Sequence, residues 1–165
     1  MGIFQMLRRR KARKAFQGLV GPELLSKPRG GAGLPAGKIE AKHFQFVIIL
    51  LDDAKPEEVP AIIGKVVSIL LQHGAILSSI TSSLLVGLLG VPFPKGDSPE
   101  LRLRLVKALL AGNGDRLRIA HGQCTGAFGL LGTEGRWTYG EVIPEFSGIL
   151  KKLLGSQFGT AVEVS

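Results

Sequence analysis

Cysteine is almost absent from this sequence of 165 residues, in which Cys124 stands alone. A single cysteine excludes an internal disulfide framework and is typical of proteins from a reducing compartment. A recognisable signal peptide is also lacking, because basic residues follow the short apolar stretch 3–7 and no apolar region of about 7–15 residues comes next. We therefore expect a cytoplasmic protein whose core is held by packing alone.

Acidic residues are scarce in the first quarter of the chain. Residues 1–38 contain nine Lys and Arg against the single acid Glu23, whereas residues 39–165 contain twelve basic and twelve acidic residues. The whole net charge of +8 therefore lies near the N-terminus. This distribution argues against a protein that binds nucleic acid over its entire surface, and it predicts a neutral globular body with a basic arm.

The predicted arm, residues 1–42, is rich in Gly and Pro and cannot bury enough apolar surface to order itself, so it is expected to be a tether. The remaining residues, 43–165, are predicted to form one α+β domain. A cluster of cations suits the phosphates of RNA or DNA, or an anionic membrane surface to which the protein binds peripherally. Apolar residues at 3–7 favour lipid or an apolar protein groove, and a solvated tail that aids solubility is the alternative. The cluster consists of Arg8, Arg9, Arg10, Lys11, Arg13 and Lys14.

No charged side chain occurs between Lys65 and Lys95, which raises the possibility that residues 75–93 span a membrane. Hydroxyl residues at 78–83 interrupt this stretch, and Gly and Pro follow them. We favour two short buried strands joined by a tight turn over the alternative of a membrane-integral subunit.

The remaining pattern predicts a ferredoxin-like fold. The continuous apolar run Phe44–Leu51 is typical of a central strand, and apolar residues at helical spacing between 59 and 70 end before Gly74. A second helix is expected from Asp97-Ser98-Pro99-Glu100 to Gly112. Together with a strand at 117–124, a helix at 142–154 and a strand at 160–164, the order is β-α-β-β-α-β with an α-β addition. This order indicates an antiparallel sheet with helices on one face.

Three stretches resemble the catalytic domain of class III adenylyl/guanylyl cyclases. The strand 46–52 resembles the family's strand that ends in a metal-binding Asp. The second stretch runs from His73-Gly74-Ala75 to Gly90-Val91-Pro92 and is similar to the family's helix end, the hairpin after it and the segment that leaves the hairpin. The third stretch, residues 117–139, is similar to the family's Arg-Ile-Gly-Ile-His strand, Gly-x-Ile-Gly turn and Tyr-containing strand. The resemblance implies the same ferredoxin-like fold.

The residues that this chemistry requires are incomplete. By resemblance, Asp52 matches the first metal ligand, but Ser82-Ser83 stands where the second carboxylate belongs, and a neutral hydroxyl cannot replace a bridging carboxylate. The family also uses an Asn that positions the ribose and, four residues later, an Arg that stabilises transition-state charge. An alignment without gaps places Ser147 and Lys151 at these two positions, and an alignment shifted by three residues places Pro144 and Gly148 there. The only Asn of the chain is Asn113, in a predicted loop. We therefore expect a degenerate, non-catalytic member without a cofactor, in which Asp52 is a vestigial metal-ligand candidate.

The expected role is that of an interaction subunit in a larger complex. Cyclase domains dimerise, so the resemblance implies a docking surface near Trp137 and Tyr139, for a protein partner or a cyclase-like dimer, with the arm as a second anchor. The alternative is a half-site partner that contributes Asp52 to an active cyclase.

Other motifs are interpreted as structural. His121 and Cys124 are too few to form a zinc site, so they are expected to be a strand histidine and a buried thiol. The segment Gly31–Lys38 lacks the spacing of a phosphate-binding loop. The spacing of glycines 126, 129 and 132 lacks the Gly-x-Gly start of a dinucleotide-binding motif, and these glycines are predicted to lie in turns.

Overall fold

The computed structural model describes residues 39–52, 55–80, 83–91, 96–133 and 136–164, and their side chains except those of residues 39–40, 79–80 and 128–142. A βαββαβ unit comes first in this part of the chain, and an added strand, helix and strand follow it. The elements are β1 (Ile39–Leu51), α3 (Val59–Gln72), β2 (Ile76–Ile80), β3 (Leu84–Leu89), α4 (Pro99–Asn113), the short helix η2 (Gly114–Arg116), β4 (Leu117–Thr133), β5 (Arg136–Val142), α5 (Phe146–Gly155) and β6 (Thr160–Val164).

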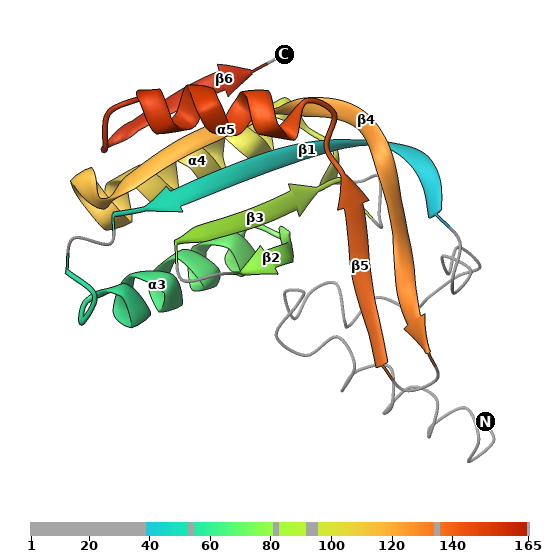
Figure 1. Ribbon diagram of the computed structural model, residues 1–165, viewed down its shortest axis with the longest axis horizontal. Helices are drawn as coiled ribbons and strands as arrows, with labels where there is room; N and C mark the ends of the chain where they lie inside the picture. The colour runs from blue at the N-terminus through green and yellow to red at the C-terminus, as the bar shows by residue number, and fades with distance from the viewer. Residues whose placement is uncertain (1–38, 53–54, 81–82, 92–95, 134–135, 165) are drawn as a thin grey trace.

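The strands form one sheet in the order β2-β3-β1-β4-β5, and β6 also pairs with β4 (Figure 1). β1 is antiparallel to both of its neighbours, β3 and β4. β6 runs parallel to the first part of β4, whereas β5 runs antiparallel to its last part. The α+β fold with an antiparallel, ferredoxin-like sheet is therefore confirmed, and the one parallel pairing among the described strands belongs to the added β6.

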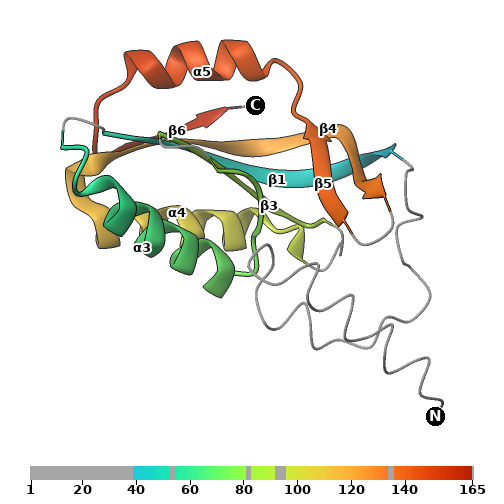
Figure 2. The ribbon, with the colours of Figure 1, turned by 60° about the horizontal axis from the view of Figure 1, so that its bottom comes forward.

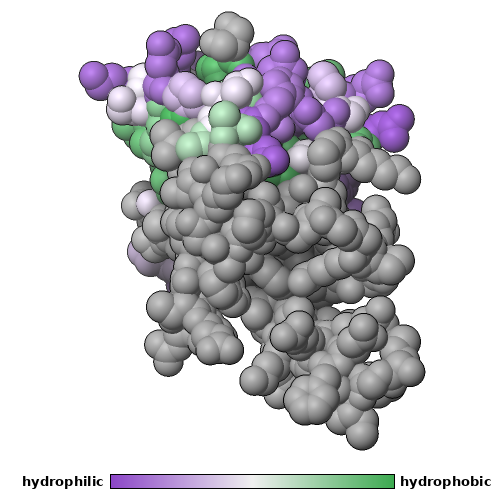
Figure 3. All heavy atoms as spheres, turned by 90° about the vertical axis from the view of Figure 1, so that its right-hand side faces the viewer, coloured by the Kyte–Doolittle hydropathy of each residue, from purple (hydrophilic) through white to green (hydrophobic). Residues whose placement is uncertain are grey.

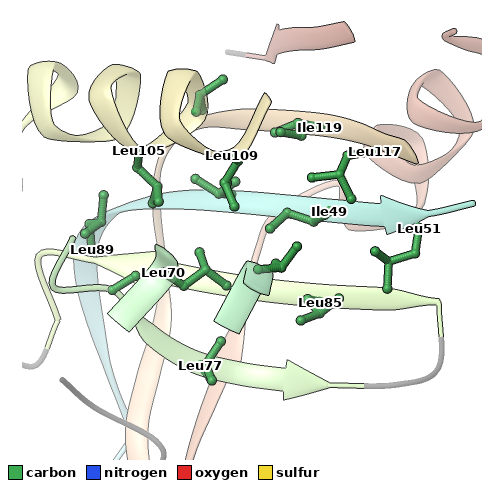
Figure 4. Packing of buried hydrophobic residues seen from close by; sticks show 14 residues of the cluster. Ile49, Leu51, Leu70, Leu77, Leu85, Leu89, Leu105, Leu109, Leu117 and Ile119 are labelled. Carbon is green, nitrogen blue, oxygen red and sulfur yellow. The ribbon is translucent and has the colours of Figure 1, made fainter. Parts of the chain in front are cut away.

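Helices α3 and α4 cover one face of the sheet, as predicted for the βαββαβ unit, and the added helix α5 lies on the other face (Figure 2). Two apolar clusters fill the two interfaces. Leu70 of α3 and Leu105 and Leu109 of α4 pack on the first face (Figure 4). Ile149 and Leu153 of α5 pack on the second face.

The position of β1 explains its continuous apolar sequence. Val47 and Ile49 pack in the cluster under α3 and α4, whereas Phe46 and Ile48 pack in the cluster under α5. Because both faces of this central strand are covered, its residues at both odd and even positions must be apolar.

The charge-free stretch forms the two predicted strands, β2 and β3, which pair with each other in antiparallel orientation. Ile76, Leu85 and Leu88 are fully buried there, so burial in the sheet accounts for the hydropathy of the stretch. The described part of this stretch forms strands rather than a helix, and among the described residues none of the helices is long and apolar enough to cross a membrane.

Three boundaries differ from the prediction. β1 begins at Ile39 rather than at the expected strand start, Phe44. β4 continues to Thr133, so glycines 126, 129 and 132 lie within a strand and the prediction that they form turns is wrong. α5 begins at Phe146 rather than at 142, because Val142 still belongs to β5 and Glu145 adopts a left-handed conformation with φ 56°.

Gly122 allows the close approach of β6 to β4. A Cβ at this position would lie 2.1 Å from the carbonyl oxygen of Val164, which is backbone and cannot rotate away. We predict that Gly122→Ala lowers the free energy of unfolding by about 1–3 kcal/mol, measured by denaturant unfolding of the full chain.

The matched control is Gly148→Ala in α5, where an added Cβ meets no atom within 4 Å. Because alanine is favoured over glycine in a helix, this variant is expected to be as stable as the wild type or up to about 1 kcal/mol more stable. Equal stability of Gly122→Ala and the wild type would contradict the close packing of β6 on β4.

Candidate functional site

Asp52 follows the last residue of β1, as the sequence predicts, at one end of the sheet. Its backbone N–H donates to the carbonyl oxygen of Arg116 (2.9 Å), and the N–H of Leu51 donates to the carbonyl oxygen of Ser83 (2.8 Å). These two bonds bring the ends of β1, β3 and β4 together. Asp52 is partly buried at this junction.

Arg116, in η2, places its guanidinium between two carboxylates. Its Nε lies 3.3 Å from Oδ2 of Asp52, and its Nη1 donates to the carboxylate of Glu58 at the start of α3. Its Nη2 donates to the backbone carbonyl of Asp52 (3.3 Å). A guanidinium that is fixed by three groups thus supplies the positive charge next to Asp52.

The ion pair changes the acidity of its members. The hydrogen bond from Arg116, followed by the one from Lys55, lowers the pKa of Glu58 below its ordinary value. The hydrogen bond with Glu58 raises the pKa of Arg116. Both effects favour the charged forms, so the cluster remains an ion pair under ordinary conditions.

The position expected for the second carboxylate is only partly described. Ser83 lies just before β3 and uses its carbonyl group to bind β1, while Asp53 and Ser82 lie outside the described residues. Within the described ranges, no group of three or more His, Cys, Asp or Glu side chains is placed to hold a metal ion.

Neither of the two alternative pairs for the ribose-binding site points to the sheet. Ser147 and Lys151 are exposed on α5, and Pro144 and Gly148 are exposed as well. Asn113 is the last residue of α4, where its side-chain amide donates to the carbonyl of Leu109 (2.9 Å). The only Asn of the chain therefore closes a helix on the face opposite α5.

His121 and Cys124 point to opposite faces of the sheet. His121 is opposite Val47, which faces α3 and α4, whereas Cys124 is opposite Phe44 and packs in the cluster under α5. The two side chains cannot bind the same ion. Burial raises the pKa of the Cys124 thiol to about 11, so the thiol stays neutral and poorly nucleophilic.

The predicted docking residues lie in β5, where Tyr139 is opposite Leu130 of β4 and Trp137 is opposite Gly132. Their side chains lie outside the described residues. The basic arm, with Arg8, Arg9, Arg10, Lys11, Arg13 and Lys14, also lies outside them.

A polar network under α4, which we call the Arg102 network, was not predicted from the sequence. Arg102 is only 3% exposed; its Nη1 donates to Oε1 of Gln45 (2.7 Å), and its Nη2 donates to the carboxylate of Glu163. Gln45 in turn donates to Oδ1 of Asp97 (2.7 Å), and Nδ1 of His43 lies 2.6 Å from Oδ2 of Asp97. The network thus joins β1, the start of α4 and β6.

The hub of the surface end of this network is Asp97. Burial raises the pKa of its carboxyl group, and hydrogen bonds from Gln45 and His43 more than offset this effect, so the pKa lies below the ordinary value. The signals in the sequence were polar residues within apolar patterns: Gln45 inside the strand run and Arg102 on the apolar side of a helix.

The ion pair of Glu58 with Arg116 leads to a testable prediction about the pKa of Glu58. Arg116→Gln should return the pKa of Glu58 toward its ordinary value, because its strongest hydrogen-bond donor is replaced by a neutral one. NMR titration of the Glu58 carboxyl in the two proteins measures the change. Lys55→Gln removes the weaker cause and should raise the pKa by less; an equal or larger rise would contradict the assignment of Arg116 as the main partner.

The comparisons with known proteins identify the fold. No family model matches the sequence, and no curated protein matches it. Among solved structures, the guanylate cyclase domain of RhGC from Catenaria anguillulae is similar over 76% of this chain and 79% of its own, with a TM-score of 0.59 and 12% identity. The adenylyl cyclase CyaB from P. aeruginosa is similar over 76% and 78%, with a TM-score of 0.53 and 13% identity.

A dimeric guanylyl cyclase domain of the RhoGC fusion protein from Blastocladiella emersonii is also similar, over 76% of this chain and 80% of its own, with a TM-score of 0.56 and 11% identity. Identities this low show the fold alone. The described part of the chain has the fold of an adenylyl/guanylyl cyclase catalytic domain.

Proposed function

We propose that this chain is a non-catalytic interaction subunit, in which a nucleotide-cyclase-like domain docks in a larger assembly and the basic arm is a second anchor. The observation that carries the proposal is the ion pair of Asp52 with Arg116. In cyclisation, the carboxylate at this position would have to bind a divalent cation that contacts the triphosphate. Here a guanidinium that Glu58 holds in place occupies the side of Asp52 as an ion-pair partner, so a cation bound to Asp52 would lie close to another positive charge.

Two further features support the loss of catalysis. The position of the second carboxylate carries Ser82-Ser83 in the sequence, and a hydroxyl adds no negative charge for a second cation. The only Asn closes α4, and the residues that α5 offers in its place are exposed Ser147 and Lys151, or Pro144 and Gly148. Each missing transition-state contact costs about 3–4 kcal/mol at the barrier, so their combined loss leaves little acceleration.

The partner that this proposal favours is a protein, bound as in a cyclase-like dimer. One structural neighbour, the guanylyl cyclase domain of the RhoGC fusion protein, is described as a non-canonical dimer and also as a monomer. The surface proposed for docking contains Trp137 and Tyr139 in β5. On the side of the molecule in Figure 3, the described surface is a mosaic of hydrophilic and smaller apolar areas. A mixed composition of this kind is compatible with an interface between separately folded proteins, which is about as apolar as the rest of a protein surface.

The absence of cyclase activity is directly testable. Purified full-length protein incubated with ATP or GTP and Mn²⁺ should form no cyclic nucleotide above the level without protein, while an active cyclase domain assayed in parallel should form it. Product formed by the chain alone that disappears in Asp52→Asn would contradict the proposal. Product formed only in a mixture with a catalytically impaired cyclase would favour the half-site alternative.

The anchoring role of the arm is tested with a full-length variant in which Arg8, Arg9, Arg10, Lys11, Arg13 and Lys14 are replaced by Gln. We expect the wild type to co-sediment with vesicles that contain anionic lipid, because each cation near such a surface contributes about 1 kcal/mol. The variant should lose this binding, and high salt should weaken that of the wild type.

The matched control is Lys151→Gln with Lys152→Gln, which removes two exposed cations from α5 and should leave vesicle binding nearly unchanged. Equal binding of the arm variant and the wild type would show that the arm does not anchor the protein to lipid. Binding of the wild type to RNA but not to vesicles would assign the cations to nucleic-acid phosphates instead.

A further inference from the structure

The C-terminal strand β6 depends on a small number of contacts. It has five residues and pairs with β4 alone among the described strands, in the parallel orientation, which is slightly less stable per residue than the antiparallel one. Glu163 is its only charged residue, and the carboxylate of Glu163 binds the buried guanidinium of Arg102. The Arg102 network therefore links β6 to α4 and β1.

His121 lies directly beside this link. In the parallel pairing of β4 and β6, His121 is opposite Glu163, so the two side chains share the face that α4 covers. The residue is only 5% exposed, and its Nδ1 is buried without a hydrogen-bond partner. A buried imidazole in this position is acceptable as long as it is neutral.

The groups that face His121 define what a second positive charge would do. From α4 the facing charged group is Arg102, and from β6 it is Glu163. β1 contributes the apolar Val47 opposite His121, and the nearest polar residue of β1 on this face is the neutral Gln45. An imidazolium would repel Arg102 and compete with it for the one carboxylate of Glu163.

We propose that His121 is a proton-sensitive latch, whose protonation weakens the Arg102–Glu163 link and releases β6 from the edge of β4. Released, β6 would uncover the edge of β4 at residues 118–122 and remove Val162 and Val164 from the cluster under α5. The uncovered edge would offer unpaired backbone N–H and C=O groups to another strand.

The electrostatics have the sign that the latch requires. Burial lowers the pKa of His121, Arg102 lowers it further, and Glu163 raises it in part. When β6 opens, water reaches the imidazole and its pKa returns toward the ordinary value of 6.5. The open form therefore takes up the proton more readily, so the closed form loses stability as the pH falls below about 6.5 toward the lower value of the closed state.

The test is hydrogen exchange of the β6 backbone amides in the full chain, expressed as protection factors at about pH 7.5 and about pH 5.5. In the wild type we expect the protection of those β6 amides that donate to β4, which alternate along this edge strand, to fall several-fold at the lower pH, while that of the β1 amides stays constant. In His121→Gln, which cannot be protonated, the two pH values should give the same protection. His43→Gln is the control, because His43 is half-exposed at the surface end of the network and should keep the wild-type response.

Three results would overturn the proposal: constant protection of β6 in the wild type, a pH response that persists in His121→Gln, or one that disappears in His43→Gln. Should His121→Gln fail to fold, NMR titration of His121 in the wild type decides the question. A pKa at or above the ordinary 6.5 would remove the driving force for the latch, whereas a lower one, with β6 exchange that follows it, would support the latch.

Discussion

The pairing of β1 with β4 over thirteen consecutive positions is the constraint on which the rest of this structure depends. It places Leu51 opposite Leu117, and this register brings Asp52 next to Arg116 at one end of the sheet. The same register sets Gln45, in the middle of β1, opposite Gln123 and under the start of α4. A shift by one residue would turn Val47 and Ile49 to the opposite face and separate both polar groups from their partners.

The two polar groups, at Asp52 and at Arg102, differ in their chemistry because they differ in burial. At the Asp52 end, the charges of Arg116 and Glu58 are near the surface, where water screens them and the pair contributes little to stability. In the Arg102 network, the guanidinium is enclosed and bound through Nη1 and Nη2, so the loss of either partner, Gln45 or Glu163, is costly. The exposed pair can define local charge, whereas the buried network holds three elements in one arrangement.

Apolar periodicity and glycines at helix ends were sufficient to predict the βαββαβ order and the fold, because they carry that information locally. The added part was predicted as α-β, and the strand β5 that precedes α5 was indicated only by the resemblance. The end of the first helix before Gly74, the start of the second helix within Asp97-Ser98-Pro99-Glu100 and the terminal strand were all predicted correctly. The extension of β4 to Thr133 was not, because its glycines are permissive in turns and strands alike. Arg116 and its partner Glu58 are 58 residues apart in the sequence, and Arg102 and its partner Glu163 are 61 residues apart. No local sequence pattern predicts contacts between residues so far apart in the chain.

The outer edge of β4 is divided between two strands. β6 occupies positions 118–122 and β5 occupies positions 127–133, and among the described strands none pairs with the four residues between them on that side. β5 and β6 therefore cover two separate parts of this edge, with a short gap between them. Among the described pairings, β5 and β6 do not pair with each other. Mechanically, the C-terminal strand can detach without unravelling the β4–β5 hairpin, so a partner bound at the hairpin need not sense the state of the chain end.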